Sequence, residues 1–162
     1  IVHRDVKPDN IFMVKDADGT YPKLLDFGIS RDTEGTSGDT RMTNTGAVVG
    51  TPLYMSPEQV RGNKTIDERT DIFSMGVVLY ELLALREPFR GRTIKETFHN
   101  ICNVTPPAPS AISKHLTVPR RLDEICLKAM QKEPRGRYSN IMDMVREIRQ
   151  FREETMLGPT GS

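Results

Sequence analysis

Apolar positions follow two different spacings along this chain, first that of β-strands and then that of helices. Two short apolar runs, residues 11–15 and 21–25, flank a polar stretch, residues 16–20, in which Asp18 and Gly19 supply turn residues. A short turn between two runs of strand-forming residues is typical of a β-hairpin. The pattern therefore predicts a hairpin near the start of the chain.

The rest of the chain carries helical spacing. Residues 71–85 are apolar on nearly every side, which predicts a helix buried all round. Apolar residues three, four and seven positions apart predict amphipathic helices over residues 94–102, 122–130 and 141–151. A proline-rich stretch, residues 105–109, predicts a stiff connector. The predicted fold class is mainly α, a short β-hairpin followed by a helical bundle.

Two stretches lack periodicity. Residues 29–49 are rich in Thr, Ser, Gly and Asp, which predicts a mobile loop, and a long loop inside a compact domain is usually functional or disordered. Residues 158–162 have the composition of a flexible tail. We therefore divide the chain into one partial domain, residues 1–154, and a flexible tail, residues 155–162.

Composition and charge favour a single globular domain and give no support for a nucleic-acid-binding or membrane-spanning chain. The chain has 162 residues and is 36% hydrophobic, which is enough for one domain or lobe with a core. Lys and Arg (23) nearly balance Asp and Glu (22), so the net charge of +1 offers no electrostatic case for a nucleic-acid partner. The chain contains no run of about 18 apolar residues, so no membrane-spanning segment is predicted within it. The cysteines, Cys102 and Cys126, match no metal-ligand spacing and are expected to be buried thiols and not a disulfide. These features predict a cytoplasmic protein, and a membrane anchor elsewhere in a longer parent protein is compatible with them.

The first ten residues hold the densest chemistry. Residues 3–10, His-Arg-Asp-Val-Lys-Pro-Asp-Asn, combine two acids, two bases, a histidine and an amide. Taken alone, Asp and Asn in such a stretch are explained by turns and caps, which their side chains favour. A stretch so rich in functional groups is expected deep inside a domain, yet it begins at residue 3. We therefore expect this chain to be a piece of a larger protein.

Five motifs, in order, resemble the eukaryotic-like serine/threonine protein kinases of bacteria. Residues 3–10 followed by Asp-Phe-Gly at 26–28 resemble the catalytic loop and the metal-binding motif of that family. The resemblance continues through residues 50–58 (Gly-Thr-Pro-Leu-Tyr-Met-Ser-Pro-Glu), 71–76 (Asp-Ile-Phe-Ser-Met-Gly) and 134–138 (Pro-Arg-Gly-Arg-Tyr). It covers nearly the whole chain. It implies the α+β protein kinase fold, of which this chain would be the C-terminal lobe.

The resemblance implies a role for each polar residue of the opening motif and for Asp26. Asp5 matches the base that accepts the proton of the substrate hydroxyl. Lys7 matches a lysine of serine/threonine kinases whose ammonium stabilises charge on the transferred phosphoryl group. Asn10 and Asp26 match the ligands that hold Mg²⁺ against the phosphates of ATP. The implied cofactors are ATP and Mg²⁺.

The resemblance also implies regulation. Arg4 matches the arginine that pairs with a phosphorylated activation loop, because a guanidinium binds a phosphate through two hydrogen bonds. Thr43 and Thr45 lie where bacterial receptor-type kinases carry a phosphorylated pair, and we predict that both are phosphosites. The alternative is that these threonines only keep the loop soluble.

Four further residues are implied to be architectural. Thr51 matches a threonine that forms hydrogen bonds with the catalytic base and the catalytic-loop lysine, here Asp5 and Lys7. Glu58 and Arg137 match a buried ion pair, and Asp71 matches an aspartate that anchors the backbone of the catalytic loop. His3 is implied to pack and to form hydrogen bonds, without a catalytic role.

Four other positions carry no functional prediction. Val6 and Ser56 stand where leucine and alanine are usual in protein kinases, and both replacements are similar in size. His99 and His115 belong to no motif and are expected to be surface or packing residues.

An intact kinase also needs a glycine-rich loop, a strand lysine and a helix glutamate, and the chain contains no G-x-G-x-x-G. We therefore expect that the chain alone binds ATP weakly and turns over negligibly, while the parent kinase phosphorylates serine or threonine of protein substrates. A kinase homodimer is the expected arrangement for trans-autophosphorylation. The alternative is a truncated lobe that acts as a binding scaffold or a decoy. The presence of Asp5, Lys7, Asn10 and Asp26 together favours the enzyme, because a scaffold needs none of this chemistry.

Overall fold

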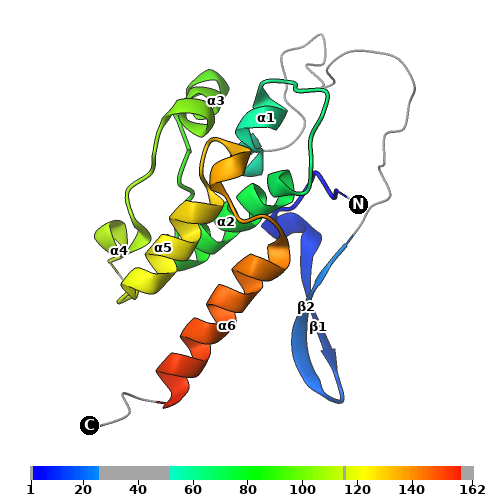
Figure 1. Ribbon diagram of the computed structural model, residues 1–162, viewed down its shortest axis with the longest axis vertical. Coiled ribbons are helices and arrows are strands. Elements are labelled where there is room, and N and C mark those ends of the chain that lie inside the picture. Colours follow the sequence, from blue (N-terminus) through cyan, green and yellow to red (C-terminus); the bar gives the residue numbers. More distant parts are fainter. Residues whose placement is uncertain (1, 26–51, 115, 158–162) are drawn as a thin grey trace.

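A computed structural model describes residues 2–25, 52–114 and 116–157 of the chain (Figure 1). The predicted loop at residues 29–49 and His115 lie outside the described residues, and their predictions stay as stated. In the described residues the fold is mainly α, with one two-stranded antiparallel sheet, which confirms the predicted fold class. We call α1 to α6, with the short turns between them, the helical body.

The hairpin follows one 3₁₀ turn, η1 (Pro8–Asn10). Strand β1 (Ile11–Asp16) pairs with β2 (Gly19–Leu24), and Asp16 lies opposite Gly19. The loop is therefore Ala17 and Asp18, shorter than predicted, and Asp16 Oδ1 accepts a hydrogen bond from the Asp18 N–H at 2.9 Å. Gly19 has φ of 132°, a backbone conformation that favours glycine.

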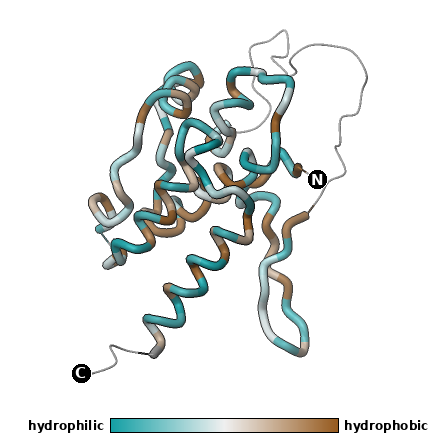
Figure 2. Tube along the Cα trace, viewed as in Figure 1, coloured by the Kyte–Doolittle hydropathy of each residue, from teal (hydrophilic) through white to brown (hydrophobic). Residues whose placement is uncertain are grey.

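The hairpin projects from the helical body and carries hydrophobic residues with it (Figures 1 and 2). Three of its large apolar side chains are 44–65% exposed: Phe12, Met13 and Tyr21. Most of the apolar surface of the hairpin is thus left uncovered by the described residues.

All four predicted helices are present; three match the prediction within two residues at each end, and α6 runs six residues further than predicted. They are α2 (Arg69–Ala84), α3 (Ile94–Asn103), α5 (Arg120–Ala129) and α6 (Ile141–Leu157). Two helices of four residues were not predicted, because a single turn is too short to show a hydrophobic period. They are α1 (Pro57–Val60) and α4 (Pro109–Ile112), and α4 begins at the last proline of the predicted connector. Two further 3₁₀ turns complete the helical body, η2 (Pro52–Tyr54) and η3 (Pro134–Gly136).

Helix α2 is the centre of the helical body. Two apolar clusters surround it, one containing Phe73, Val77, Tyr80, Ala84, Phe89, Ile101, Cys126 and Met130, and the other Ile72, Ile125, Ala129, Tyr138 and Met144. The prediction that this helix is buried on every side is wrong at its C-terminal end, where Leu82 is 65% and Leu85 is 61% exposed. Its packing partners, mainly α4, α5 and η2, leave these side chains in solvent. Both cysteines are free thiols; Cys126 is buried as predicted, whereas Cys102 is half-buried.

The close packing of α2 on α5 depends on Gly76. A Cβ atom at this position would lie 2.8 Å from Ala129 Cβ and 2.9 Å from Met130 Cγ. We expect Gly76→Ala to lower the free energy of unfolding by about 1 kcal/mol, because overpacking costs roughly 1–3 kcal/mol while alanine gains roughly 1 kcal/mol over glycine in a helix. Chemical denaturation measures this, and unchanged or higher stability would contradict it. Gly136→Ala is the control, because its Cβ would meet only the Gln131 side chain, at 3.2 Å or more.

Helix α6 extends beyond the predicted domain boundary. It ends at Leu157, so the first three residues of the predicted tail, 155–157, are helical. Thr155 Oγ1 donates to the Phe151 carbonyl at 2.8 Å, and no helix-breaking residue occurs before Gly158. Residues 158–162 lie outside the described residues. None of the helices among the described residues is long and apolar enough to cross a bilayer.

Candidate active site

The opening loop brings Asp5, Lys7 and Asn10 together. Lys7 Nζ lies 3.0 Å from Asp5 Oδ1 and 2.9 Å from Oδ2, and Asn10 Nδ2 donates to Asp5 Oδ2 at 3.0 Å. The Asp5 side chain is 62% exposed, whereas Asn10 is buried. A carboxylate oriented by two donors is thus open to solvent, where a substrate hydroxyl could reach it.

The amide of Asn10 has its nitrogen engaged. Nδ2 donates to the Asp5 carbonyl at 2.7 Å as well as to its carboxylate, which leaves Oδ1 for other partners. An amide oxygen suits a hard cation such as Mg²⁺. The Leu25 N–H donates to the Asn10 carbonyl at 2.8 Å, so the chain passes Asn10 one residue before Asp26. Asp26 itself lies outside the described residues, and its role stays a prediction.

His3 connects the two segments of this site. Its Nδ1 accepts the Asp5 N–H at 3.3 Å, and its Nε2 lies 3.2 Å from the Leu25 carbonyl. Because Nδ1 accepts, the neutral ring carries its proton on Nε2, which donates to Leu25. The imidazole therefore fixes the backbone of Asp5 relative to the residue before Asp26.

Helix α2 anchors the same loop through Asp71, in its first turn. Asp71 Oδ2 accepts the His3 N–H at 2.7 Å, and Oδ1 accepts the Arg4 N–H at 2.9 Å. Arg4 has φ of 66°, a left-handed conformation that is costly for a residue with a Cβ and persists only where its surroundings impose it. The Arg4 side chain belongs to an exposed residue, but Thr43, Thr45 and Thr51 lie outside the described residues. Phosphate pairing by Arg4 therefore stays a prediction.

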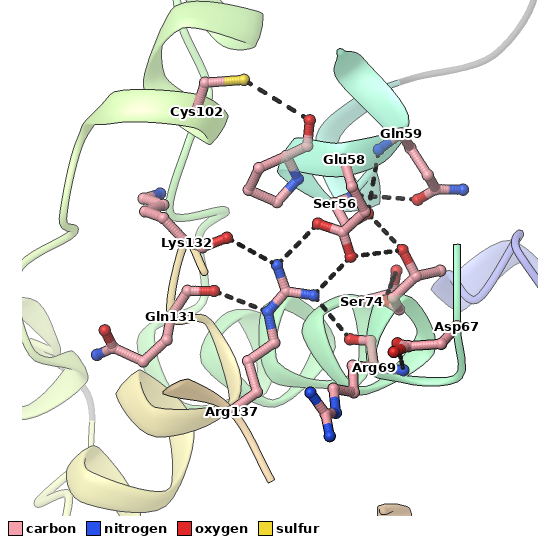
Figure 3. Close-up of polar contacts among 12 residues, drawn as sticks. Ser56, Glu58, Gln59, Asp67, Arg69, Ser74, Cys102, Gln131, Lys132 and Arg137 are labelled. Carbon is pink, nitrogen blue, oxygen red and sulfur yellow. Dashed lines mark hydrogen bonds and ion pairs between the residues drawn. The ribbon is translucent and has the colours of Figure 1, made fainter. Parts of the chain in front are cut away.

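Glu58 and Arg137 form a buried ion pair (Figure 3). Nη1 and Nη2 of Arg137 donate to the two carboxylate oxygens at 2.6 and 2.8 Å, and the side chains are 0% and 7% exposed. Burial alone would raise the pKa of Glu58, but the hydrogen bonds and charge of Arg137 hold it below its ordinary value. The other three N–H groups of Arg137 donate to the carbonyls of Arg69, Gln131 and Lys132. All five guanidinium donors are satisfied.

Two hydroxyl groups extend this ion pair. Thr70 Oγ1 donates to Glu58 Oε1 at 2.8 Å, so Ser56 Oγ donates in turn to Thr70 Oγ1 at 2.5 Å. Ser56 Oγ also accepts the Gln59 N–H at 3.4 Å as the N-cap of α1. Thr70 and Gln59 belong to no residue set that the motifs singled out. Residues 56–59, Ser-Pro-Glu-Gln, do match a capping box, and that signal could have predicted α1.

Comparison with known proteins covers the residues of this site. The family model for the protein kinase domain matches residues 1–151. This chain belongs to the protein kinase family. The kinase resemblance predicted from the motifs is thereby confirmed.

Several bacterial serine/threonine-protein kinases are similar to this chain. A probable serine/threonine-protein kinase of Streptomyces coelicolor is 39% identical over 162 residues, which is 100% of this chain and 23% of that protein. Serine/threonine-protein kinase PknB of Mycolicibacterium smegmatis is 41% identical over 144 residues, 89% of this chain and 22% of that protein. Serine/threonine-protein kinase Pkn1 of Myxococcus xanthus is 40% identical over 146 residues, 87% of this chain and 20% of that protein. The chain thus spans a fifth to a quarter of the length of these relatives.

Lys132 lies beside the ion pair of this kinase chain. Its Nζ donates to the Asn100 and Ile101 carbonyls at 3.3 and 2.8 Å, near the C-terminus of α3, and lies 3.9 Å from the centre of the Phe89 ring. Both contacts favour an ammonium. Burial opposes them and lowers the pKa of Lys132 to about 8.

This pKa predicts how stability depends on pH. In the unfolded chain a lysine keeps its proton up to a pKa of about 10.4. Between pH 8 and that value the unfolded state binds more protons at Lys132 than the folded state, so stability gains with rising pH. We expect the free energy of unfolding of the wild type, minus that of Lys132→Met, to be flat below pH 8 and to rise above it. Chemical denaturation at several pH values measures the difference, with exposed Lys95→Met as the control, and a difference that falls would contradict the prediction.

Proposed function

We propose that the protein containing this chain is an ATP-dependent serine/threonine protein kinase, and that this chain supplies its catalytic loop, metal ligands and activation segment. The observation that carries the proposal is the exposed Asp5 carboxylate, which Lys7 Nζ and Asn10 Nδ2 hold from two sides. Phosphoryl transfer requires little covalent chemistry from the protein. It requires charged groups held in fixed positions, and the Asp5 carboxylate is such a group.

Each of these residues has a separate task in the proposed reaction. Asp5 accepts the proton of the attacking serine or threonine hydroxyl. Lys7, whose ammonium already borders the carboxylate, stabilises the oxygens of the transferred phosphoryl group. Asn10 Oδ1 and the Asp26 carboxylate would hold Mg²⁺, which when bound neutralises charge on the phosphates of ATP.

The substrates we propose are proteins, because the relatives are protein kinases by name. We further propose that two copies of the parent kinase phosphorylate each other at Thr43 and Thr45, and that Arg4 pairs with the added phosphate. A phosphate that accepts two hydrogen bonds from the Arg4 guanidinium would order the activation segment beside Asp5. We propose a cytoplasmic location for this part of the protein, where ATP is available.

A transfer assay tests the proposal. The protein encoded by the complete gene is incubated with ATP, Mg²⁺ and a generic serine/threonine substrate, and phosphorylated residues are mapped by mass spectrometry. We expect phosphoserine or phosphothreonine in the substrate, phosphate on Thr43 and Thr45, and loss of both when a chelator removes Mg²⁺. Substrate binding without any transfer would instead support the scaffold or decoy. Transfer with unmodified Thr43 and Thr45 would retain the kinase and refute the phosphosites.

A further inference from the structure

We propose that Gln59 is a positioning residue of this kinase, which holds the catalytic loop in place through the backbone carbonyl of Arg4. This inference rests on the proposed function and adds a residue to its machinery. Gln59 lies in α1, 54 positions after the proposed base Asp5 in the numbering of the chain, and it touches none of the reacting groups. It acts through the backbone next to that base.

The side chain of Gln59 is engaged at both ends. Its Oε1 accepts the Ser56 N–H at 3.0 Å, which completes the capping box of α1 (Figure 3). Its Nε2 donates to the Arg4 carbonyl at 2.9 Å. The first bond belongs to the helix, whereas the second links α1 to the catalytic loop.

The loop is thus held from two directions at one residue. The N–H of Arg4 is held by Asp71 of α2 at 2.9 Å, and its carbonyl is held by Gln59 of α1. Arg4 has the left-handed φ of 66°, and such a conformation needs support on both sides to persist. The peptide group whose carbonyl Gln59 binds also carries the Asp5 N–H, which His3 accepts. A rotation of this peptide would therefore move the proposed base.

Helix α1 is a firm support for this contact. The residue before Gln59 is Glu58, whose carboxylate is held by Arg137 and Thr70. The contact thereby connects the ion pair of Glu58 and Arg137, through α1, to the catalytic loop. A displaced α1 would withdraw the donor from Arg4, so the position of α1 and the geometry of Asp5 are coupled.

The two bonds of Gln59 can be separated by substitution. Gln59→Glu keeps an oxygen for the Ser56 N–H, and Ser-x-x-Glu is itself a favourable capping box, but it removes the donor to Arg4. Gln59→Met removes both bonds without adding charge. Ser56→Ala removes the hydroxyl cap and keeps the Gln59 side chain, and alanine is the residue that protein kinases usually carry there. The three variants are made in the protein encoded by the complete gene.

Kinetics and amide exchange together test the inference. For Gln59→Glu and Gln59→Met we expect kcat to fall about fivefold, the ratio that corresponds to one net hydrogen bond, with KM for ATP unchanged. We expect the amides of residues 3–5 to exchange hydrogen faster in both variants. Gln59→Glu and Ser56→Ala should both lower the melting temperature slightly, because each loses at least one hydrogen bond. Ser56→Ala should nevertheless keep kcat and the exchange of residues 3–5, which separates loss of stability from loss of the loop contact.

The possible outcomes are distinct. Wild-type kcat and exchange in Gln59→Glu would overturn the inference and leave the proposed kinase intact. A loss in Gln59→Glu without a loss in Gln59→Met would also overturn it, because added charge and not a lost donor would then be the cause. If the wild-type protein transfers no phosphate, the proposed function fails, and the exchange of residues 3–5 still decides whether Gln59 holds the loop.

Discussion

Asp5→Asn is expected to lower the kcat of the parent kinase at least about a hundredfold, because a positioned general base contributes roughly 10²–10⁴-fold. Asparagine is nearly isosteric with aspartate but cannot accept the substrate proton. It keeps an oxygen that can accept from Asn10 or Lys7, the two side chains that orient the carboxylate. We therefore expect KM for ATP to stay close to that of the wild type.

The fold should tolerate this substitution, because the Asp5 side chain is 62% exposed. Surface substitutions usually change stability by no more than about 0.5 kcal/mol, so the melting temperature should be unchanged. Asp18→Asn, an equivalent change in the exposed turn of the hairpin, is the control and should retain full activity. Steady-state kinetics on the same substrate measures both variants. An Asp5→Asn protein that keeps more than about a tenth of the wild-type kcat would rule out Asp5 as the general base.

The sequence predicts those parts of this fold whose cause is local. Helices α3, α5 and α6 show their period because one side of each is buried, and burial selects apolar residues at that spacing. The hairpin is instead indicated by its turn residues, and α2 by a nearly continuous apolar run. Helices of one turn, such as α1, contain too few positions for a period to appear. In α1 the capping residues Ser56 and Gln59 carry a local signal, whereas α4 has no side-chain cap.

The candidate site also has a part that the sequence predicts and a part that it does not. Asp5, Lys7 and Asn10 lie within six consecutive residues, so a sequence motif can predict all three. The structure places them in contact. The contacts that hold this motif come from distant residues: Asp71 lies 67 positions from Arg4, and Gln59 lies 55 positions from it. Residue types alone do not indicate such pairs, since a single Gln or Thr on a short helix has many satisfactory partners.

The left-handed backbone of Arg4 illustrates the limit most clearly. No local preference of arginine predicts φ of 66°; the Arg4 N–H and carbonyl are both held by distant residues, and the neighbouring Asp5 N–H is held locally by His3. The exposure of Leu82 has the same kind of origin. Its side chain is apolar like its neighbours in α2, and only the placement of the other helices decides that it meets solvent.

Arg137→Ala is expected to destabilise the helical body by roughly 3–5 kcal/mol, the cost of leaving one partner of a buried ion pair alone. The Glu58 carboxylate would remain 7% exposed with only Thr70 as a hydrogen-bond donor from a side chain among the described residues. Three backbone carbonyls would also lose the guanidinium, those of Arg69, Gln131 and Lys132. Arg135→Ala, two residues earlier and exposed, should change stability by no more than about 0.5 kcal/mol.

The sign of the pH dependence gives this prediction a second, independent measurement. The pKa of Glu58 is held below its ordinary value in the folded state, so the pair stabilises the fold fully above the unfolded pKa. That stabilisation is lost as the pH falls through the folded pKa, because the carboxyl group then becomes neutral. The difference in free energy of unfolding between the wild type and Arg137→Ala should therefore be largest near neutral pH and shrink in acid.

A double substitution separates the ion pair from simple loss of packing. Removing both charges in Glu58→Leu/Arg137→Met leaves no uncompensated carboxylate, and replacing a buried pair by apolar groups of similar volume is often close to neutral. We expect the double variant to be more stable than Arg137→Met alone, although the three freed carbonyls keep it below the wild type. Chemical denaturation of the wild type, the two single variants Glu58→Leu and Arg137→Met, and the double variant measures this coupling. Additive losses in the double variant would show that the pair contributes nothing beyond its separate side chains.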